Sequence, residues 1–295
     1  MSEPETTSSG AAPVPAAPGA PLVVASGLRK QFRLGSRETL VALDDVSLEI
    51  RRGETFGLVG ESGSGKSTVS RALLGLLPLD AGSVQFDGVE VTRLKGGELR
   101  RLRKRMQMVF QDPFAALNRR QSVAQIVAAP LEAHGIGDRA SRAARVEEML
   151  DLVGLGPAYR ERRPREMSGG QCQRVAIARA LALDPELVVL DESVSALDVS
   201  IQAQVLNLLG ELQQRLGLTY LFISHDLAVV RYMASTVAVM QRGRIVERGS
   251  REQLFRSAQH EYTRQLMSAI PAVDPTAERA RRRAARTEAG VSSGG

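Results

Sequence analysis

The sequence contains one cysteine and four lysines, and it lacks any long apolar run. The single Cys172 excludes an internal disulfide framework and any metal or iron–sulfur site that needs several cysteines. We therefore expect Cys172 to be a small buried hydrophobic residue. No stretch approaches the roughly 18 to 20 apolar residues that span a bilayer, and the N-terminus lacks a charged region followed by an apolar one. We expect a protein that is cytosolic or peripheral to a membrane.

The remaining composition is that of an ordinary globular chain. Its 295 residues are 43% hydrophobic and 24% charged, which allows one large domain or two modest ones. Residues 1–21 are rich in alanine and proline, and residues 273–295 are rich first in arginine and then in glycine and serine. We expect both ends to be disordered tails, with the folded domain at 22–272. The net charge of +6 is spread too widely to indicate nucleic acid or an anionic membrane surface.

A glycine-rich loop, residues 60–68, follows the apolar run 55–59 and precedes a helical pattern at 69–77. Glycines at this spacing let backbone N–H groups point inward around a chain of phosphates. Lys66 supplies a compact positive charge for the terminal phosphates, and Ser67 supplies a hydroxyl for Mg²⁺. Because only four of the 39 basic residues are lysines, a lysine at this position is informative.

The rest of the chain alternates between strand and helix patterns. Residues 22–24 and 41–50 predict an antiparallel β edge, and residues 98–183 predict a mostly helical subdomain. The apolar run 187–190 is typical of a buried parallel strand, and it is followed by helices at 201–216 and 227–234 and strands at 218–223, 236–240 and 244–248. A last helical stretch is expected at 251–270. This alternation predicts a parallel sheet with right-handed crossovers.

Two acidic residues follow the buried strand at the edge where such sheets bind their ligands. Asp191 is suited to holding Mg²⁺, and Glu192 to polarising the water that attacks a γ-phosphate. His225 ends another strand within possible reach of the same phosphates, although a lone histidine there is more often structural. Residues 168–171 precede the helical run 175–183 and form a second anion site at a helix start. Because one nucleotide does not need both loops from one chain, we expect two chains to pair head to tail.

The ordered set of motifs resembles the ATP-binding subunits of ABC transporters over about residues 22–272. Residues 60–68 are similar to the Walker A loop, Gln111 to the Q-loop glutamine and residues 168–171 to the signature. Residues 187–191 resemble the Walker B strand, residues 195–198 the D-loop and His225 the switch histidine. The resemblance implies an α/β fold with a P-loop NTPase (RecA-like) core, the antiparallel β edge and the inserted helical subdomain. Phe32 matches the placement of the family's adenine-stacking aromatic, with an ordinary core residue as the alternative.

Within that family, residues 111–118, 195–204 and 260–263 are similar to the oligopeptide/dipeptide importer ATPases, which include nickel and other small-solute members. Two departures stand out. Ser193 replaces a common proline after the catalytic glutamate, which leaves the turn less restrained. Many relatives also have a cysteine-bearing C-terminal extension that looks like an iron–sulfur site. We expect this chain to lack that extension, so regulation from that region is not expected to carry over.

The resemblance implies ATP and Mg²⁺ as cofactors and assigns a role to each motif. Glu192, His225 and Gln111 are the expected catalytic residues. Mg²⁺ is expected at Ser67, Gln111 and Asp191. ATP is expected to contact Phe32, Gly60, Glu61, Ser62, Gly63, Ser64, Gly65, Lys66, Ser67 and Thr68 of one chain and Ser168, Gly169, Gly170, Gln171 and Asp198 of the other.

The implied function is hydrolysis of ATP to power uptake of oligopeptides, dipeptides or a similar small solute. The implied partners are membrane permease subunits, a second ATPase of the same or a related chain and, indirectly, a solute-binding protein, at the cytoplasmic face of the inner membrane. One alternative is the ATPase of an exporter. Another is an ATPase acting on nucleic acid, supported only by the basic run 100–105 and the tail arginines; no nucleic-acid partner is expected. The solute itself is not determined by the sequence.

Overall fold

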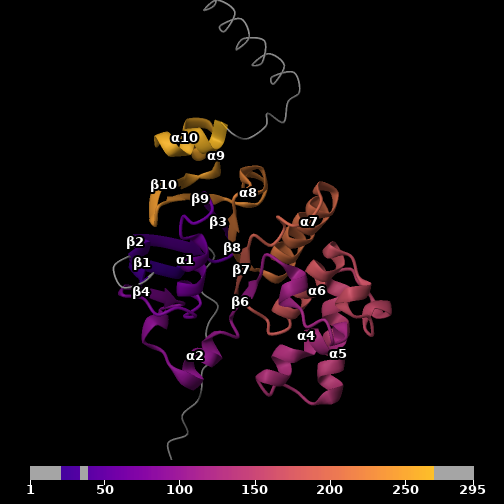
Figure 1. The fold of residues 1–295 in the computed structure, drawn as a ribbon. Coiled ribbons are helices and arrows are strands. Elements are labelled where there is room, and N and C mark those ends of the chain that lie inside the picture. The colour runs from indigo at the N-terminus through magenta and orange to yellow at the C-terminus, as the bar shows by residue number, and fades with distance from the viewer. Residues whose placement is uncertain (1–20, 34–38, 269–295) are drawn as a thin grey trace, which may run out of the picture.

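The structure of the chain is a computed structural model that describes residues 21–33 and 39–268. Its strands form an antiparallel sheet of order β2-β1-β4-β5 and a mostly parallel sheet of order β10-β9-β3-β8-β7-β6 (Figure 1). The strands of the first sheet are β1 (Pro21–Arg33), β2 (Thr39–Arg51), β4 (Ala81–Phe86) and β5 (Val89–Glu90). Those of the second are β3 (Thr55–Val59), β6 (Met106–Val109), β7 (Leu187–Asp191), β8 (Thr219–Ser224), β9 (Thr236–Gln241) and β10 (Arg244–Ser250).

The helices occupy three places around the sheets. In Figure 1, α4 to α7 lie on one side of the parallel sheet, α1 lies near the antiparallel sheet, and α9 and α10 lie beyond β9 and β10. The α-helices are α1 (Lys66–Leu73), α2 (Gly96–Leu102), α3 (Pro113–Ala116), α4 (Val123–Ala133), α5 (Arg139–Leu152), α6 (Gly169–Leu181), α7 (Val199–Leu216), α8 (Leu227–Met233), α9 (Arg251–Ser257) and α10 (Glu261–Ser268). Short 3-10 turns at Val91–Arg93, Pro157–Tyr159 and Pro164–Glu166 join some of them.

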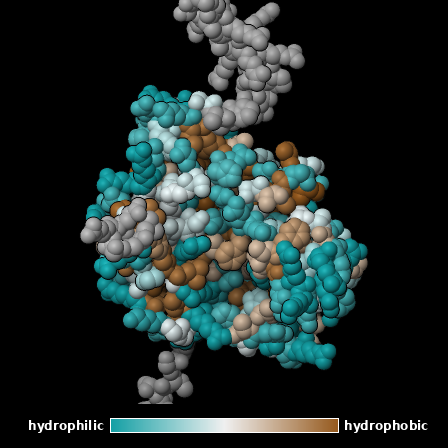
Figure 2. Space-filling view, viewed as in Figure 1, coloured by the Kyte–Doolittle hydropathy of each residue, from teal (hydrophilic) through white to brown (hydrophobic). Residues whose placement is uncertain are grey.

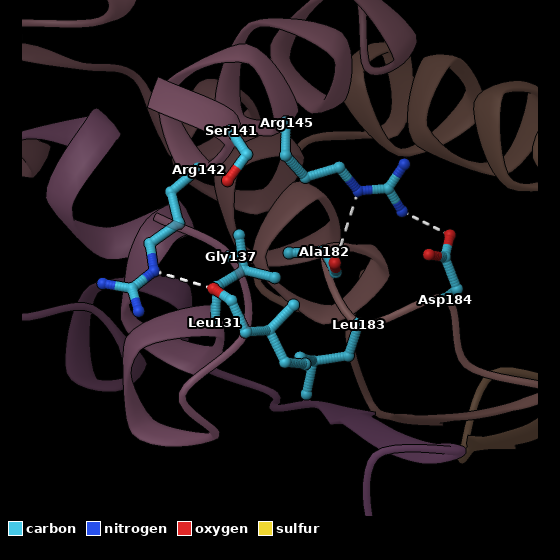
Figure 3. A pocket seen from close by; sticks show the side chains of 9 residues that line it. Leu131, Gly137, Ser141, Arg142, Arg145, Ala182, Leu183 and Asp184 are labelled. Carbon is cyan, nitrogen blue, oxygen red and sulfur yellow. Dashed lines mark hydrogen bonds and ion pairs between the residues drawn. The ribbon is translucent and has the colours of Figure 1, made fainter. Parts of the chain in front are cut away.

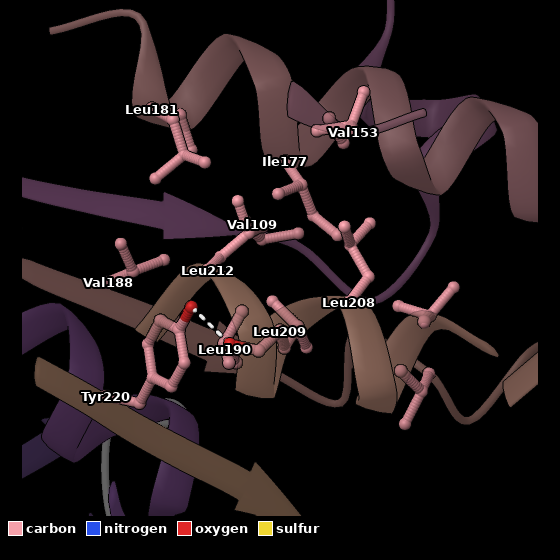
Figure 4. Packing of buried hydrophobic residues seen from close by; sticks show 14 of the residues in the cluster. Val109, Val153, Ile177, Leu181, Val188, Leu190, Leu208, Leu209, Leu212 and Tyr220 are labelled. Carbon is pink, nitrogen blue, oxygen red and sulfur yellow. Dashed lines mark hydrogen bonds between the residues drawn. The ribbon is translucent and has the colours of Figure 1, made fainter. Parts of the chain in front are cut away.

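The central parallel strands are buried on both faces, as continuous apolar runs predict. In β7, Val188 and Leu190 join the core formed with the helices, whereas Leu187 and Val189 join the core shared with the antiparallel sheet. This alternation follows from the two-residue period of a strand. Figure 4 shows the first core, where side chains of α6 and α7 meet β7 and β8.

An ion-pair network joins the turns at one end of the two sheets. Arg52 donates to Glu186 at 2.6 Å and to Asp87, and Arg105 donates to the same two carboxylates. The hydrogen bond from Arg105 holds the pKa of the Asp87 carboxyl below its usual range. Because Arg105 and Glu186 precede β6 and β7, the network lies at the opposite end of these strands from Asp191.

Three elements differ from the sequence-based expectations. The segment 98–183 is mostly helical, but it contains β6, which pairs with β7 as an edge strand of the parallel sheet. Helix α1 ends at Leu73 rather than 77, because Gly75 adopts φ 62° and Arg103 donates to the carbonyls of Leu74 and Gly75. The expected helical stretch 251–270 is two helices, α9 and α10, with a turn between them. Apart from Pro21 in β1, the expected tails 1–21 and 273–295 lie outside the described residues.

Candidate nucleotide site

The loop at residues 60–68 leaves the carboxyl end of β3 and continues into α1. Close packing requires glycine at two of its positions. A Cβ on Gly60 would lie 2.1 Å from the carbonyl oxygen of Met240, and one on Gly65 would lie 2.4 Å from that of Ala42. Both residues also have positive φ, which non-glycine residues rarely adopt. The loop is therefore pressed against β2 and β9 and opens only toward its other side.

Lys66 is the first residue of α1 and is only 5% exposed. Its ammonium donates to the carbonyls of Gly60 at 2.7 Å and Glu61 at 2.8 Å. Burial lowers the pKa of Lys66, against the opposing effect of the carboxylates of Glu192, Asp191 and Glu61. A buried ammonium that bonds only neutral carbonyls in its own loop is well placed to exchange them for phosphate oxygens.

Ser67 and Asp191 meet although they are 124 residues apart in the chain. The Ser67 hydroxyl donates to Oδ1 of Asp191 at 3.3 Å. Asp191 ends β7 and is 9% exposed, and its burial raises the pKa of its carboxyl despite the Ser67 hydrogen bond. A hydroxyl and a carboxylate side by side are oxygen ligands of the kind Mg²⁺ takes in nucleotide sites, where phosphates supply the remaining ligands. Among the described residues, no group of three or more His, Cys, Asp or Glu side chains could hold a metal ion by itself.

Glu192 and His225 also meet, with Nδ1 of His225 3.3 Å from Oε1 of Glu192. Glu192 follows β7 with φ 48°, an unusual conformation for a residue with a side chain, and donates its N–H to Ile223 of β8. The next turn is closed by Ser195, whose N–H and hydroxyl both donate to the Glu192 carbonyl. Hydrogen bonds from Ser195 thus close the turn in which Ser193 replaces proline.

The predicted signature residues cap helix α6. Ser168 accepts the N–H of Gln171, whose side-chain oxygen accepts the N–H of Ser168 at 3.0 Å, so the pair forms a capping box. The Gln171 amide also donates to Tyr159 Oη. Ser168 is exposed, Gly169 is half-buried and Gly170 is buried. The contacts of these residues are therefore made within the helical part of the chain, whereas the phosphate loop is held by the sheets.

The other predicted site residues have definite positions. Because Val109 of β6 pairs with Leu190 of β7, the exposed Gln111 lies just beyond the same sheet edge as Asp191 and Glu192. Asp198 is the exposed N-cap of α7. Phe32 is half-buried in β1, with the ammonium of Lys30 5.6 Å from its ring centre. Within the loop, Glu61, Ser62, Gly63 and Ser67 are exposed, Ser64 is buried, and Gly65 and Thr68 are half-buried.

One contact with the loop escaped the sequence analysis. The N–H of Glu61 donates to the hydroxyl of Tyr262 in α10 at 3.0 Å. Tyr262 stood out in the sequence only as part of an importer-like segment, and neither its spacing nor its residue type indicated a partner. The contact between Glu61 and Tyr262 can be recognised only in the three-dimensional structure.

Two further features lie apart from this site. Cys172 has no solvent exposure, and burial raises the pKa of its thiol to about 11, which confirms that it is a buried residue. A cavity of about 260 Å³ is lined by residues of α4 and α5, by the turn between them and by residues 182–184 just after α6. Figure 3 shows this cavity, where Arg142 and Arg145 donate to nearby carbonyls. None of the predicted site residues lines this cavity.

The described part of the chain contains no helix that could span a membrane. No helix there combines the length and apolar composition that crossing a bilayer requires. The face shown in Figure 2 is mostly hydrophilic, with hydrophobic side chains gathered in patches near its middle.

The fold and the site define a P-loop nucleotide-hydrolysing protein, with a phosphate loop on β3 and adjoining acids on β7. The sequence matches the family of ABC transporters over residues 43–195 and the C-terminal region of oligopeptide/dipeptide transporters over residues 246–294. The chain belongs to the ABC transporter family, as an ATP-hydrolysing, ATP-binding subunit.

Similar proteins of the family span most of the chain. A peptide import ATP-binding protein of Brucella abortus (strain 2308) is 54% identical over 257 residues, covering 87% of this chain and 81% of that protein. The oligopeptide transport ATP-binding protein OppF of Streptococcus mutans is 48% identical over 261 residues, covering 88% and 85%. These matches extend the family assignment to most of the chain.

Two solved structures are similar in fold. The first is a dimeric ATP-binding cassette, MJ0796, bound to ADP and Pi, with 30% identity and a TM-score of 0.70 over 77% of this chain and 98% of that one. The second is cbiO1 from Clostridium perfringens, part of the ABC transporter complex cbiONQ, with 28% identity and a TM-score of 0.72 over 86% and 97%. Both confirm the predicted P-loop ATPase fold.

Proposed function

We propose that this chain is the ATPase subunit of an importer that takes up oligopeptides, dipeptides or a similar small solute through a separate permease. The observation that carries the proposal is that two parts of the chain match together: the ATPase region and the C-terminal region of oligopeptide/dipeptide transporters. Relatives named for peptide import or oligopeptide transport match 80% or more of the chain. An exporter or a nucleic-acid ATPase is not favoured by any of these relatives.

The phosphate loop holds ATP through its inward N–H groups and through Lys66. On binding, the Lys66 ammonium exchanges the carbonyls of Gly60 and Glu61 for phosphate oxygens, which bear charge and bind it more strongly. Phe32, half-buried in β1, stacks on the adenine. This assignment is supported by the burial of Lys66 and by its bonds to neutral carbonyls, which phosphate oxygens can replace.

Ser67, Asp191 and Gln111 hold Mg²⁺ in this proposal. The adjoining oxygens of Ser67 and Asp191 suit the ion, and Gln111 lies beyond the same sheet edge. The ion, when bound, neutralises part of the phosphate charge during transfer. The chain's own contribution is to keep the Asp191 carboxylate buried and oriented by the Ser67 hydroxyl.

Glu192 and His225 act at the γ-phosphate. Glu192 orients and polarises the attacking water, and His225 donates a hydrogen bond to the γ-phosphate. Their 3.3 Å contact supports this pairing, because it orients the imidazole beside the carboxylate at the carboxyl ends of β7 and β8. Positioning and electrostatic stabilisation, rather than covalent chemistry, supply the rate enhancement.

A second ATPase subunit completes the site by presenting Ser168, Gly169, Gly170, Gln171 and Asp198 to the bound ATP. The N-terminus of α6, with Ser168 exposed at its N-cap, favours an anion through the helix dipole. We place the assembly at the cytoplasmic face of the inner membrane, where the helical segment after Gln111 docks on the permease. A solute-binding protein delivers the solute to the other side.

The direct experiment is to purify the complex from its native membrane through a tag on this chain and to identify the copurifying subunits. The complex is then placed in proteoliposomes with its solute-binding protein, and uptake of labelled dipeptides and oligopeptides is measured with and without ATP. We expect ATP-dependent peptide uptake that a complex carrying Glu192→Gln does not support. Outward transport, or copurification without any permease, would contradict the proposal.

A further inference from the structure

Helix α10 is hydrogen-bonded to the phosphate loop through Tyr262. Its hydroxyl accepts the N–H of Glu61 at 3.0 Å, although the two residues are 201 positions apart. The helix lies in the region that matches the C-terminal part of oligopeptide/dipeptide transporters. Figure 1 shows α9 and α10 beyond β9 and β10, outside the sheets that carry the predicted catalytic residues. The contact thus links a peripheral segment to the nucleotide loop.

Tyr262 holds Glu61, a residue at which the loop's internal hydrogen bonds converge. The carbonyl of Glu61 accepts both the Lys66 ammonium at 2.8 Å and the N–H of Ser64 at 3.2 Å. When Lys66 turns to a phosphate, the first of these bonds is lost. The bond to Tyr262 is made by the N–H of the same residue and not by the carbonyl that Lys66 leaves, so the loss of the Lys66 bond does not break it.

Tyr262 is itself held firmly. It is 6% exposed and packs in the large core shared by β7, β8 and the helices. Its N–H donates to Nδ1 of His260 at 3.2 Å, and Glu247 of β10 accepts the N–H groups of Gln259 at 2.8 Å and His260 at 3.0 Å. The position of the phenol is therefore set by the turn between α9 and α10, not by the loop.

We propose that Tyr262 is a positioning residue of the ATP site, through which the C-terminal segment holds the phosphate loop in the conformation that binds nucleotide. The proposal rests on the role of residues 60–68 in binding ATP. A loop ordered in advance loses less conformational freedom on binding, so its affinity for ATP is higher. By linkage, bound nucleotide stabilises the docking of α10 to the same degree.

The test compares Tyr262→Phe with the wild type in the full chain. Phenylalanine keeps the buried ring and removes only the hydroxyl. Loss of one hydrogen bond of ordinary strength corresponds to a factor of about three to ten, so we expect the Kd for a non-hydrolysable ATP analogue to rise by that factor. In the ATPase assay, KM for ATP should increase more than kcat decreases. Calorimetric titration and initial rates measure the two effects.

Tyr220→Phe is the matched control. Tyr220 is 1% exposed, and its hydroxyl donates to the Leu209 carbonyl at 3.0 Å, far along β8 from the phosphate loop (Figure 4). Both variants lose one buried hydrogen bond and should be destabilised similarly, but only Tyr262→Phe should weaken nucleotide binding. An unchanged Kd in Tyr262→Phe, or an equal rise in both variants, would overturn the proposal.

A second measurement needs no variant to fold. We expect hydrogen exchange in residues 259–268 of the wild type to slow when the ATP analogue binds, and unaltered exchange there would count against the coupling.

In a double-mutant cycle, Glu247→Ala should weaken binding in the wild type but add little in Tyr262→Phe, because both act through the phenol. If the effects of Glu247→Ala and Tyr262→Phe on the binding free energy were fully additive, Glu247 would not act through Tyr262. A wild type that binds no ATP would instead refute the proposed function.

Discussion

Asp191 carries a buried carboxylate at the end of β7 with one hydroxyl donor, Ser67, beside it. Burial raises the pKa of this carboxyl, so the ionised form destabilises the nucleotide-free fold at pH values above that pKa. A carboxylate at this position can bind a cation, but it lowers the stability of the nucleotide-free fold. Such a conflict is common where a site must be ready for a charged ligand.

We predict that Asp191→Asn stabilises the nucleotide-free chain by about 1 kcal/mol near neutral pH while abolishing ATPase activity. Because the raised pKa makes the wild-type carboxyl neutral as the pH falls through it, the difference between the two proteins should shrink toward acidic pH. Urea denaturation at several pH values measures this difference in the free energy of unfolding. Asp198→Asn is the control, since asparagine caps a helix as well as aspartate and should leave stability unchanged. A less stable Asp191→Asn chain would contradict this account.

At the scale of elements, the start of α6 is pressed against the first turn of α7. A Cβ on Gly170 would lie 2.3 Å from Cγ2 of Ile201, a distance that no real Cβ tolerates. This contact joins the predicted signature to the turn capped by Asp198. Small residues at such a contact set how closely two helices approach.

We predict that Gly170→Ala destabilises the chain by about 1–3 kcal/mol through overpacking and lowers ATPase activity. Truncating the neighbour in the double variant Gly170→Ala/Ile201→Ala should recover part of the lost activity. At Gly210 in α7, an added Cβ would have no neighbour within 4 Å, so Gly210→Ala should instead stabilise by about 0.5–1 kcal/mol. Thermal unfolding and ATPase rates distinguish these variants. Equal effects at both glycines would contradict the role assigned to the Gly170–Ile201 contact.

For the whole molecule, the exposed N-cap Ser168 of α6 and the phosphate loop belong to separate parts of the fold, which favours a site shared between two subunits. We predict that Glu192→Gln binds ATP with Mg²⁺ but does not turn it over, and that ATP-bound dimers accumulate. Size-exclusion chromatography with and without ATP measures the dimer. The Lys66→Ala chain should bind no nucleotide and should remain a monomer. Normal hydrolysis by Glu192→Gln would refute the role assigned to Glu192.

Much of the fold followed from local patterns. The apolar run 187–190 predicted the doubly buried strand β7, and the glycine spacing at 60–68 predicted the turn from β3 into α1. The strand β6 was missed because four residues, Met106–Val109, are too few to show a period inside a helical segment. Its identity depends on pairing with β7, which is a long-range contact.

The sequence by itself determined the phosphate loop, the two acids at the end of β7 and the order of most strands and helices, because glycine geometry and hydrophobic period are local properties. The tertiary structure alone decided which of these residues meet. It brought Ser67 to Asp191, Glu192 to His225 and Tyr262 to Glu61, across separations that no local pattern encodes. Such contacts depend on how buried surfaces pack, which is fixed only when the whole core forms.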